Sequence, residues 1–170
     1  MDSQSVSDQQ LSELAHRLGE ALCARELMIA TAESCTGGWV AQVITSVPGS
    51  SQWFERGFIT YSNRAKQEML AVREATLEAH GAVSEATVTE MAEGALRHSH
   101  AQVGLAVSGI AGPGGAVLDK PVGTVCLAWA GVGVATRART EHFAGGRQEV
   151  RRAAVAAALT GVLELLTAWP

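Results

Sequence analysis

Short apolar runs alternate with helical patterns along most of this chain, and this alternation restricts the fold more than any other feature. Residues 28–32 and 103–107 are compact apolar runs, typical of strands in a sheet that is covered on both faces. Residues 124–130 and 132–143 also have strand character, and Gly131 between them indicates a hairpin, which makes part of the sheet antiparallel. The pattern predicts an α/β fold, a three-layer α/β/α sandwich with a mixed, mostly parallel sheet.

The other elements follow from apolar periodicity and turn residues. Leucines recur at three- and four-residue intervals from Leu11 to Leu22, which predicts a helix, and Ser7 with Gln10 has the spacing of a capping box. Further elements are expected as helices over 39–47, around Lys66, from 85 to 98 behind an N-cap at Ser84, and over 147–169, and as a strand over 57–61. The 170 residues are expected to form a single domain, 1–170, with residues 1–7 as a flexible tail.

Composition excludes several functional classes. The net charge is −4, and no basic run is interleaved with aromatic residues, so a nucleic-acid partner is not expected. Residues 1–10 are polar and lack the pattern of a signal peptide, and apolar stretches such as 153–159 are far shorter than the ~20 residues that span a bilayer. We therefore expect a cytoplasmic protein with no membrane partner.

Metal and cofactor sites are not expected either. Cys23, Cys35 and Cys126 are far apart and lack CxxC spacing. His98 and His100 are two residues apart, so on a helix they would point in different directions, and no neighbouring ligand completes a set. The cysteines are expected to be free thiols.

A first turn with chemical potential follows the strand at 28–32. It contains Glu33, Ser34, Cys35, Thr36, Gly37 and Gly38, and a helix is expected to start directly behind it. Backbone N–H groups at such a helix start can hold a phosphate or a developing oxyanion, and the two glycines would let a ligand approach closely. The plain alternative is that Thr36 caps the helix and the glycines form the bend.

A second turn, after the strand at 57–61, brings a lysine. A serine that attacks an amide needs a proton acceptor, and no histidine lies near these turns, so Lys66 is the candidate if it is neutral. An unperturbed lysine is neutral only about once in 2,500 at pH 7, so the pKa of Lys66 must be lowered by burial. Tyr61, the only tyrosine, could relay the proton or hold the lysine; the alternative is that Lys66 is an ordinary exposed helix lysine and Tyr61 an interfacial strand residue.

A third turn, residues 108–115, is too rich in glycine and proline for anything but a loop, and it could bind a ribose or a phosphate. Its spacing does not fit the dinucleotide-binding glycine pattern. A tight structural crossing of the chain is the alternative.

The turns identify a protein family only when they are taken together, as part of six motifs that occur in a fixed order. They are TAESCTGG at 31–38, VPGSS at 47–51, TYSN at 60–63 with Lys66, HGAVS at 80–84, SGIAGPG at 108–114 and KPVGT at 120–124. This order resembles the CinA C-terminal-domain family, over about residues 11–166, and is most similar to its stand-alone members, which are nicotinamide-nucleotide amidases.

The resemblance implies a metal- and cofactor-free hydrolysis of the carboxamide of nicotinamide mononucleotide to nicotinate mononucleotide and ammonia, in NAD salvage. It assigns the nucleophile to Ser34 and the base to Lys66, with Tyr61 assisting. With the turns above, it gives an expected substrate-binding set: Glu33, Thr36, Gly37, Gly38, Ser108, Gly109, Ala111, Gly112 and Arg147. The partner is a small-molecule substrate, and a homo-oligomer, with a dimer as the expected form, is implied.

Several alternatives stay open from the sequence. Cys35 is a chemical rival to Ser34, although adjacent residues at a strand end are expected to face opposite ways. Glu33 either orients Lys66 or faces solvent, and the phosphate lies either on the helix start at Gly37 or on the third turn with Arg147. The family usually has an acidic residue where this chain has Gly146. A catalytically silent nucleotide-binding or regulatory module is the rival function.

Overall fold

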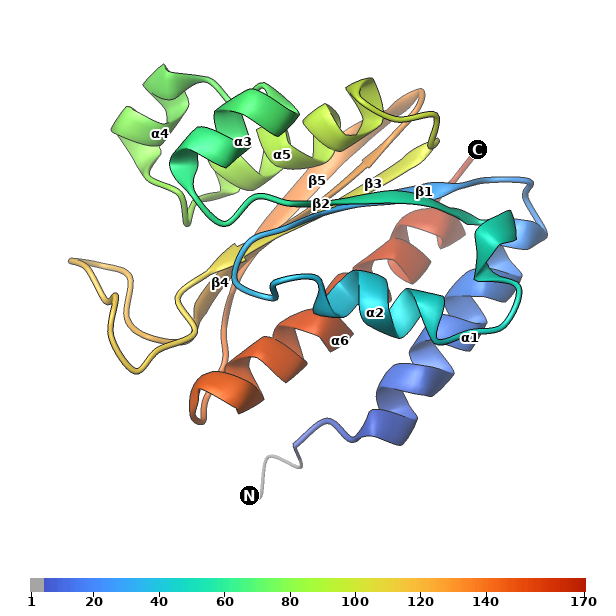
Figure 1. The fold of residues 1–170 in the computed structure, drawn as a ribbon, viewed down its shortest axis with the longest axis horizontal. Helices are drawn as coiled ribbons and strands as arrows, with labels where there is room; N and C mark the ends of the chain where they lie inside the picture. The colour runs from blue at the N-terminus through green and yellow to red at the C-terminus, as the bar shows by residue number, and fades with distance from the viewer. Residues whose placement is uncertain (1–4) are drawn as a thin grey trace.

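The computed structural model describes residues 5–170 and contains six α-helices, a short 3₁₀ helix and five strands in that range (Figure 1). In chain order the elements are α1 (Asp8–Cys23), β1 (Ile29–Glu33), α2 (Trp39–Thr45), η1 (Ser50–Gln52), β2 (Phe54–Ile59), α3 (Asn63–Leu70), α4 (Glu74–His80), α5 (Glu85–Arg97), β3 (Val103–Gly109), β4 (Thr124–Gly131), β5 (Val134–His142) and α6 (Arg147–Thr167).

The five strands form one sheet in the order β2-β1-β3-β4-β5. β1 is parallel to both of its neighbours, while β4 is antiparallel to β3 and to β5. Four strands therefore run in one direction and β4 alone runs in the other, which confirms the expected mixed, mostly parallel sheet. The predicted hairpin at the end of β4 is present, with Gly131 paired to Val134.

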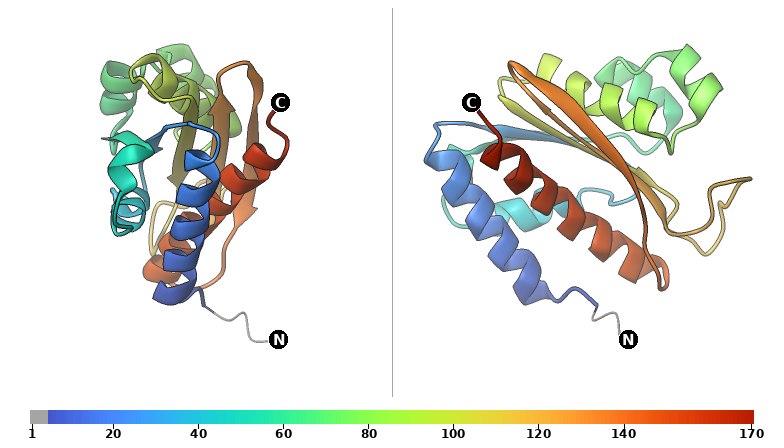
Figure 2. Two further views of the ribbon diagram at one scale, coloured as in Figure 1. Left: turned by 90° about the vertical axis from the view of Figure 1, so that its right-hand side faces the viewer. Right: turned by 180° about the vertical axis from the view of Figure 1, so that it is seen from behind.

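Helices cover both faces of the sheet, as expected for a three-layer sandwich (Figure 2). α1, α2 and α6 pack on one face around a core that includes Leu18, Ile29 and Leu159. α3, α4 and α5 lie on the other face, around a core rich in alanine that includes Leu70 and Met91. Both cores are built from side chains that leave the strands on alternating sides.

Two glycines let α5 lie close to the sheet and to α3. A Cβ on Gly94 of α5 would lie 2.1 Å from the carbonyl oxygen of Leu70 in α3, and a Cβ on Gly104 of β3 would lie 2.5 Å from the carbonyl oxygen of Ala92 in α5. α5 therefore contacts α3 and the sheet backbone to backbone, and this contact fixes α3 beside the carboxyl end of β1.

The main differences from the sequence prediction concern β3, β2 and α4. Ser108 and Gly109 belong to β3, where they pair with Cys126 and Val125, and not to a loop. Gly109 is needed there because a Cβ would lie 2.7 Å from Val125 Cγ2, so the glycine marks a close crossing and not a chain break. β2 also begins and ends earlier than 57–61, at Phe54 and Ile59, and α4 was not predicted.

The N-terminal end of the described chain is fixed to the fold. Ser7 caps α1, and its side chain and that of Gln10 form the predicted capping box. Val6 packs against the core, and residues 1–4 of the expected tail lie outside the described residues. None of the helices between residues 5 and 170 is long and apolar enough to cross a membrane. Over the same range, no three His, Cys, Asp or Glu side chains gather as a metal site would require.

Candidate active site

The three predicted turns meet at one edge of the sheet. β1, β2 and β3 are parallel neighbours, so their carboxyl ends lie together, as ligand sites in open α/β sheets usually do. A cavity of about 240 Å³ lies at this edge. Its lining consists of Ser34, Cys35, Tyr61, Asn63, Lys66, Ala82, Val83, Ser108, Gly109, Ala111 and Arg147.

Ser34 and Lys66 are in direct contact inside this cavity. The Lys66 Nζ atom lies 3.0 Å from the Ser34 Oγ atom and 2.8 Å from the carbonyl oxygen of Thr60. Ser34 is 9% exposed and Lys66 is 1% exposed. A neutral amine in this position can donate to Thr60 and accept the hydroxyl proton of Ser34, so the pair has the geometry of a nucleophile and its base.

The fold holds each member of the pair through its backbone. The Ser34 N–H donates to the carbonyl oxygen of Val107 in β3, which fixes the start of the turn against the central strand. Lys66 lies in the first turn of α3, where the Ser62 side chain caps the helix by accepting from the Ala65 N–H. Lys66 and Leu70 are four residues apart, so both lie on the buried face of α3.

Burial changes the protonation of Lys66. Removal of the ammonium group from water lowers the pKa of Lys66 from its ordinary 10.5 to about 8. At pH 7 about one molecule in eleven then carries the neutral amine, against about one in 2,500 for an unperturbed lysine. Lys66 therefore has the lowered pKa that a lysine requires to act as a base near neutral pH.

Glu33 occupies a place that the sequence analysis did not anticipate. It is the last residue of β1 and is 1% exposed, and its carboxylate accepts from the Thr36 hydroxyl at 2.6 Å and from the N–H groups of Val40 and Ala41 at 2.8 and 3.1 Å. The prediction that Glu33 orients Lys66 or faces solvent is therefore wrong. The carboxylate caps α2, whose N-cap residue Gly38 has no side chain to do so.

Cys35 also lines the cavity, but its side chain packs in the core on the α1, α2 and α6 face of the sheet, whereas Ser34 contacts Lys66 of α3, which lies on the other face. Burial raises the pKa of the Cys35 thiol to about 11, although the Arg151 guanidinium opposes this. The thiol therefore stays protonated near neutral pH, which favours Ser34 as the nucleophile.

Tyr61 and Arg147 form the outer wall of the cavity. Arg147 donates from Nη2 to the Tyr61 hydroxyl at 3.1 Å and from Nη1 to the carbonyl oxygen of Gly112 at 2.8 Å. Tyr61 is 62% exposed. Lys66 is held by the Thr60 carbonyl, so the phenol's partner in this structure is the arginine and not the lysine.

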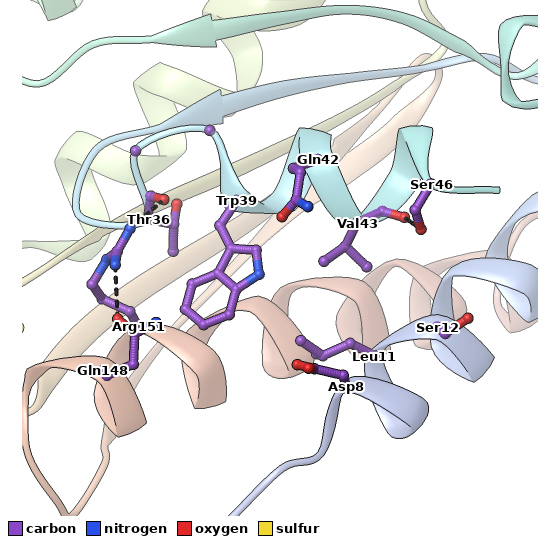
Figure 3. Close-up of a pocket in the computed structure, with 12 residues that line it drawn as sticks. Asp8, Leu11, Ser12, Thr36, Trp39, Gln42, Val43, Ser46, Gln148 and Arg151 are labelled. Carbon is purple, nitrogen blue, oxygen red and sulfur yellow. Dashed lines mark hydrogen bonds between the residues drawn. The ribbon is translucent and has the colours of Figure 1, made fainter.

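Three residues of the expected substrate-binding set line a different hollow. Thr36, Gly37 and Gly38 face a cleft of about 660 Å³ between α1, α2 and α6, which shares no lining residue with the cavity of Ser34 (Figure 3). This cleft is the larger one, but Ser34 and Lys66 do not line it. The geometry therefore favours the smaller cavity as the site of chemistry.

Asn63, Ala82 and Val83 line the cavity without having been predicted as site residues. All three lie in motifs that the sequence analysis singled out, TYSN and HGAVS, so the signal was present without an assigned role. The connection between α4 and α5 brings Ala82 and Val83 to the site, and the sequence analysis did not predict α4.

Comparison with known proteins agrees with this geometry. The family model of the CinA C-terminal domain matches residues 11–166. The chain belongs to the CinA C-terminal domain family. The resemblance that the motif order predicted is thereby confirmed.

Curated relatives and solved structures cover nearly the whole chain. "Nicotinamide-nucleotide amidohydrolase PncC" of Escherichia coli K12 is 54% identical over 154 residues, which are 91% of this chain and 93% of that protein. The protein of the same name in Pseudomonas putida is 50% identical, over 92% of this chain and 98% of its own length. The crystal structure of the competence/damage-inducible protein CihA from Agrobacterium tumefaciens superposes with a TM-score of 0.90 at 43% identity, covering 96% of this chain and 98% of its own.

Proposed function

We propose that this protein is a nicotinamide-nucleotide amidase that hydrolyses the carboxamide of nicotinamide mononucleotide, with Ser34 as nucleophile and Lys66 as general base. The observation that supports this most directly is the 3.0 Å contact between Lys66 Nζ and Ser34 Oγ at a buried lysine. The reaction itself is suggested by the curated relatives named PncC at about 54% identity.

The first half of the reaction forms an acyl-enzyme. The Ser34 oxygen attacks the carboxamide carbon while the neutral Lys66 amine takes the hydroxyl proton, which leaves an oxyanion and an ammonium on Lys66. The tetrahedral species then breaks its C–N bond. Lys66 gives the proton to the departing nitrogen, so ammonia leaves and the neutral amine is regenerated.

The second half returns the enzyme to its starting state. Water attacks the ester carbon, and Lys66 takes one proton from that water and passes it to the Ser34 oxygen as the ester bond breaks. The products are nicotinate mononucleotide and the free Ser34 hydroxyl. The net change is one water consumed for each carboxylic acid and ammonia formed.

Arg147 is the residue that we assign to the substrate phosphate. Of the side chains that line the cavity, Lys66 and Arg147 are the cations, and Lys66 is committed to Ser34. Arg147 uses two of its five N–H donors on Gly112 and Tyr61, which leaves others for a phosphate oxygen. The α2 N-terminus is a weaker candidate because Glu33 already accepts from the N–H groups of Val40 and Ala41.

We further propose that the protein acts in the cytoplasm and returns the deamidated nucleotide to NAD synthesis. The test of the core proposal is ammonia release from nicotinamide mononucleotide by the wild type and by Ser34→Ala. We expect the substitution to reduce kcat by at least about 10³-fold without changing the fold, because no nucleophile remains. Cys35→Ala is the matched control and should retain activity.

The outcomes of this assay separate the rival functions. Substrate binding without ammonia release by the wild type would favour a silent nucleotide-binding module. An active Ser34→Ala together with an inactive Cys35→Ala would move the nucleophile to the thiol.

A further inference from the structure

Arg151 binds the turn that follows Ser34, residues 35–38, from the side of the larger cleft and not from the cavity that Ser34 lines. From α6 it donates Nε to the carbonyl oxygen of Cys35 at 3.1 Å. Its Nη2 donates to the carbonyl oxygen of Thr36 at 3.2 Å (Figure 3). Its third contact, Nη1 to Gln148 Oε1 at 3.0 Å, fixes the guanidinium on its own helix. The Arg151 guanidinium carbon also lies 5.3 Å from the centre of the Trp39 ring.

These contacts bear on the amide groups of the turn. The Gly37 N–H donates to the Ser34 carbonyl, the Trp39 N–H donates to the Thr36 carbonyl, and the N–H groups at the start of α2 donate to Glu33. The N–H groups of Cys35, Thr36 and Gly38 have no acceptor in another residue within residues 5–170, and of these the Thr36 N–H belongs to the peptide group whose carbonyl Arg151 binds. A free N–H two residues after a nucleophilic serine is a natural donor to the oxyanion that forms when that serine attacks.

The Thr36 N–H points away from the carbonyl that Arg151 binds. The Cys35 carbonyl and the Thr36 N–H belong to one trans peptide group, so they point in opposite directions. Arg151 binds that carbonyl and lines the larger cleft, whereas Ser34 lines the separate cavity. A guanidinium on the carbonyl also polarises the peptide and strengthens its N–H as a donor.

We propose that Arg151 is a positioning residue for the amidase reaction, which holds and polarises the Cys35–Thr36 peptide so that the Thr36 N–H binds the oxyanion. The inference rests on the proposed function and names a group outside the catalytic pair. It predicts that removal of the Arg151 side chain destabilises the transition state more than the bound substrate, because the oxyanion exists only after attack.

The neighbouring residue gives a matched control. Arg152 also stacks on Trp39, at 5.0 Å, and its charged partner is Asp8, so it shares the helix and the ring with Arg151 but does not contact the turn. Arg151→Met and Arg152→Met keep an unbranched side chain that reaches as far as the arginine Nε position, and they remove the guanidinium donors. Arg151→Lys keeps the charge, but a single ammonium cannot bridge two carbonyls as the guanidinium fork does.

The experiment measures kcat and KM for nicotinamide mononucleotide, and the Kd of the product, in all three variants. We expect Arg151→Met to lower kcat roughly 10- to 100-fold, somewhat less than direct loss of an oxyanion donor, with KM and product Kd within about twofold. Arg151→Lys should give an intermediate kcat, and Arg152→Met should match the wild type. Equal kcat values for the two methionine variants, or a loss confined to KM, would overturn the inference.

A second substrate separates this inference from the proposed function. Acylation of Ser34 by p-nitrophenyl acetate passes through an oxyanion at the same place, and it is followed by p-nitrophenol release and by mass spectrometry of the modified peptide. The same fall in rate is expected for Arg151→Met. If the wild type releases no ammonia but Arg151→Met still slows acylation, the substrate assignment fails and the role of Arg151 stands. If acylation is unaffected, or if Ser34 is not acylated in the wild type, the inference fails.

Discussion

Glu33 and Lys66 are both ionisable residues beside Ser34, and both are only 1% exposed. Their side chains differ in the hydrogen-bond partners that the fold provides. At the start of α2, the Glu33 carboxylate accepts three hydrogen bonds from the turn that it closes. At the start of α3, Lys66 has a carbonyl and the nucleophile as partners, and burial lowers its pKa to about 8. Neither charge has a counter-ion, so the difference lies in the hydrogen bonds: the carboxylate with three donors to accept from builds structure, whereas the amine, whose charged form is poorly compensated, becomes reactive.

Replacement of Lys66 tests the reactive side of this comparison and has the largest expected effect. Lys66→Met should lower kcat by about 10³-fold or more, because the general base is lost. The same variant should be the more stable protein at pH 7. The shift of the Lys66 pKa from 10.5 to about 8 corresponds to roughly 3 kcal/mol of disfavoured charge, only partly offset by the lost hydrogen bonds.

The size of this stability difference depends on pH. Between pH 8 and 10.5 the unfolded chain holds a proton on Lys66 that the folded chain does not, so the free energy of unfolding of the wild type rises with pH in that window. Lys66→Met lacks this titration. Urea unfolding of both proteins from pH 7 to 10.5 should show the advantage of the variant shrinking by roughly 3 kcal/mol. A constant difference would show that Lys66 is not a buried cation.

The pH profile of wild-type activity also tests Lys66 as the general base. Only neutral Lys66 accepts the serine proton, so kcat/KM should rise about 50-fold from pH 6 to pH 8 and level off above about pH 9. Steady-state ammonia release over this range measures it. A flat profile would contradict Lys66 as the base.

Replacement of Glu33 tests the structural side. In Glu33→Gln one carboxylate oxygen becomes an NH₂ group, which faces either the Ala41 N–H or the donors on the other oxygen, so a buried donor is left without an acceptor. We expect a loss of about 1–3 kcal/mol in the free energy of unfolding. Glu20→Gln, on the exposed face of α1, is the matched control and should change stability by less than about 0.5 kcal/mol. If both variants unfold alike, Glu33 is not the cap of α2.

The same contrast explains which parts of the site could be read from the sequence. Ser34 and Lys66 lie in motifs that follow strand ends, and Arg147 lies at the predicted start of the last helix. Parallel strands bring such positions to one edge of the sheet, and all three residues line one cavity. Glu33 stood in the correct motif with the wrong role, because its partners at 40 and 41 depend on how tightly the turn folds back. Arg151 looks like any arginine on an amphipathic helix, and only the docking of α6 against the turn reveals its contacts.

Much of the fold, like much of the site, could be predicted from the sequence. Continuous apolar runs located β1, β3 and β4, and leucine spacing located α1. The glycine-rich stretch at 108–115 was assigned to a loop throughout because glycine at a close crossing and glycine at a turn look the same in a sequence. Gly109 serves the crossing, while Gly112 and Gly115 have positive φ angles of 88° and 91°, which are typical of turns.

The smallest expected effect concerns a helix start that the chain leaves uncapped, in contrast to the one that Glu33 closes. Gly146 is the N-cap of α6, with extended backbone at φ −78° and ψ −176° and no side-chain cap. Gly146→Ser places a hydroxyl where it can accept from the first-turn N–H groups, and we expect a gain of a few tenths of a kcal/mol in urea unfolding. Gly145→Ser is the control and should lose stability, because Gly145 has φ +101° and a Cβ there would lie 2.8 Å from Glu149 Cβ. Equal responses at the two positions would show that the start of α6 gains nothing from a cap. A gain confined to Gly146 would extend to α6 the rule that Glu33 demonstrates for α2: a helix start beside this site is stabilised by a side-chain acceptor where the chain supplies one.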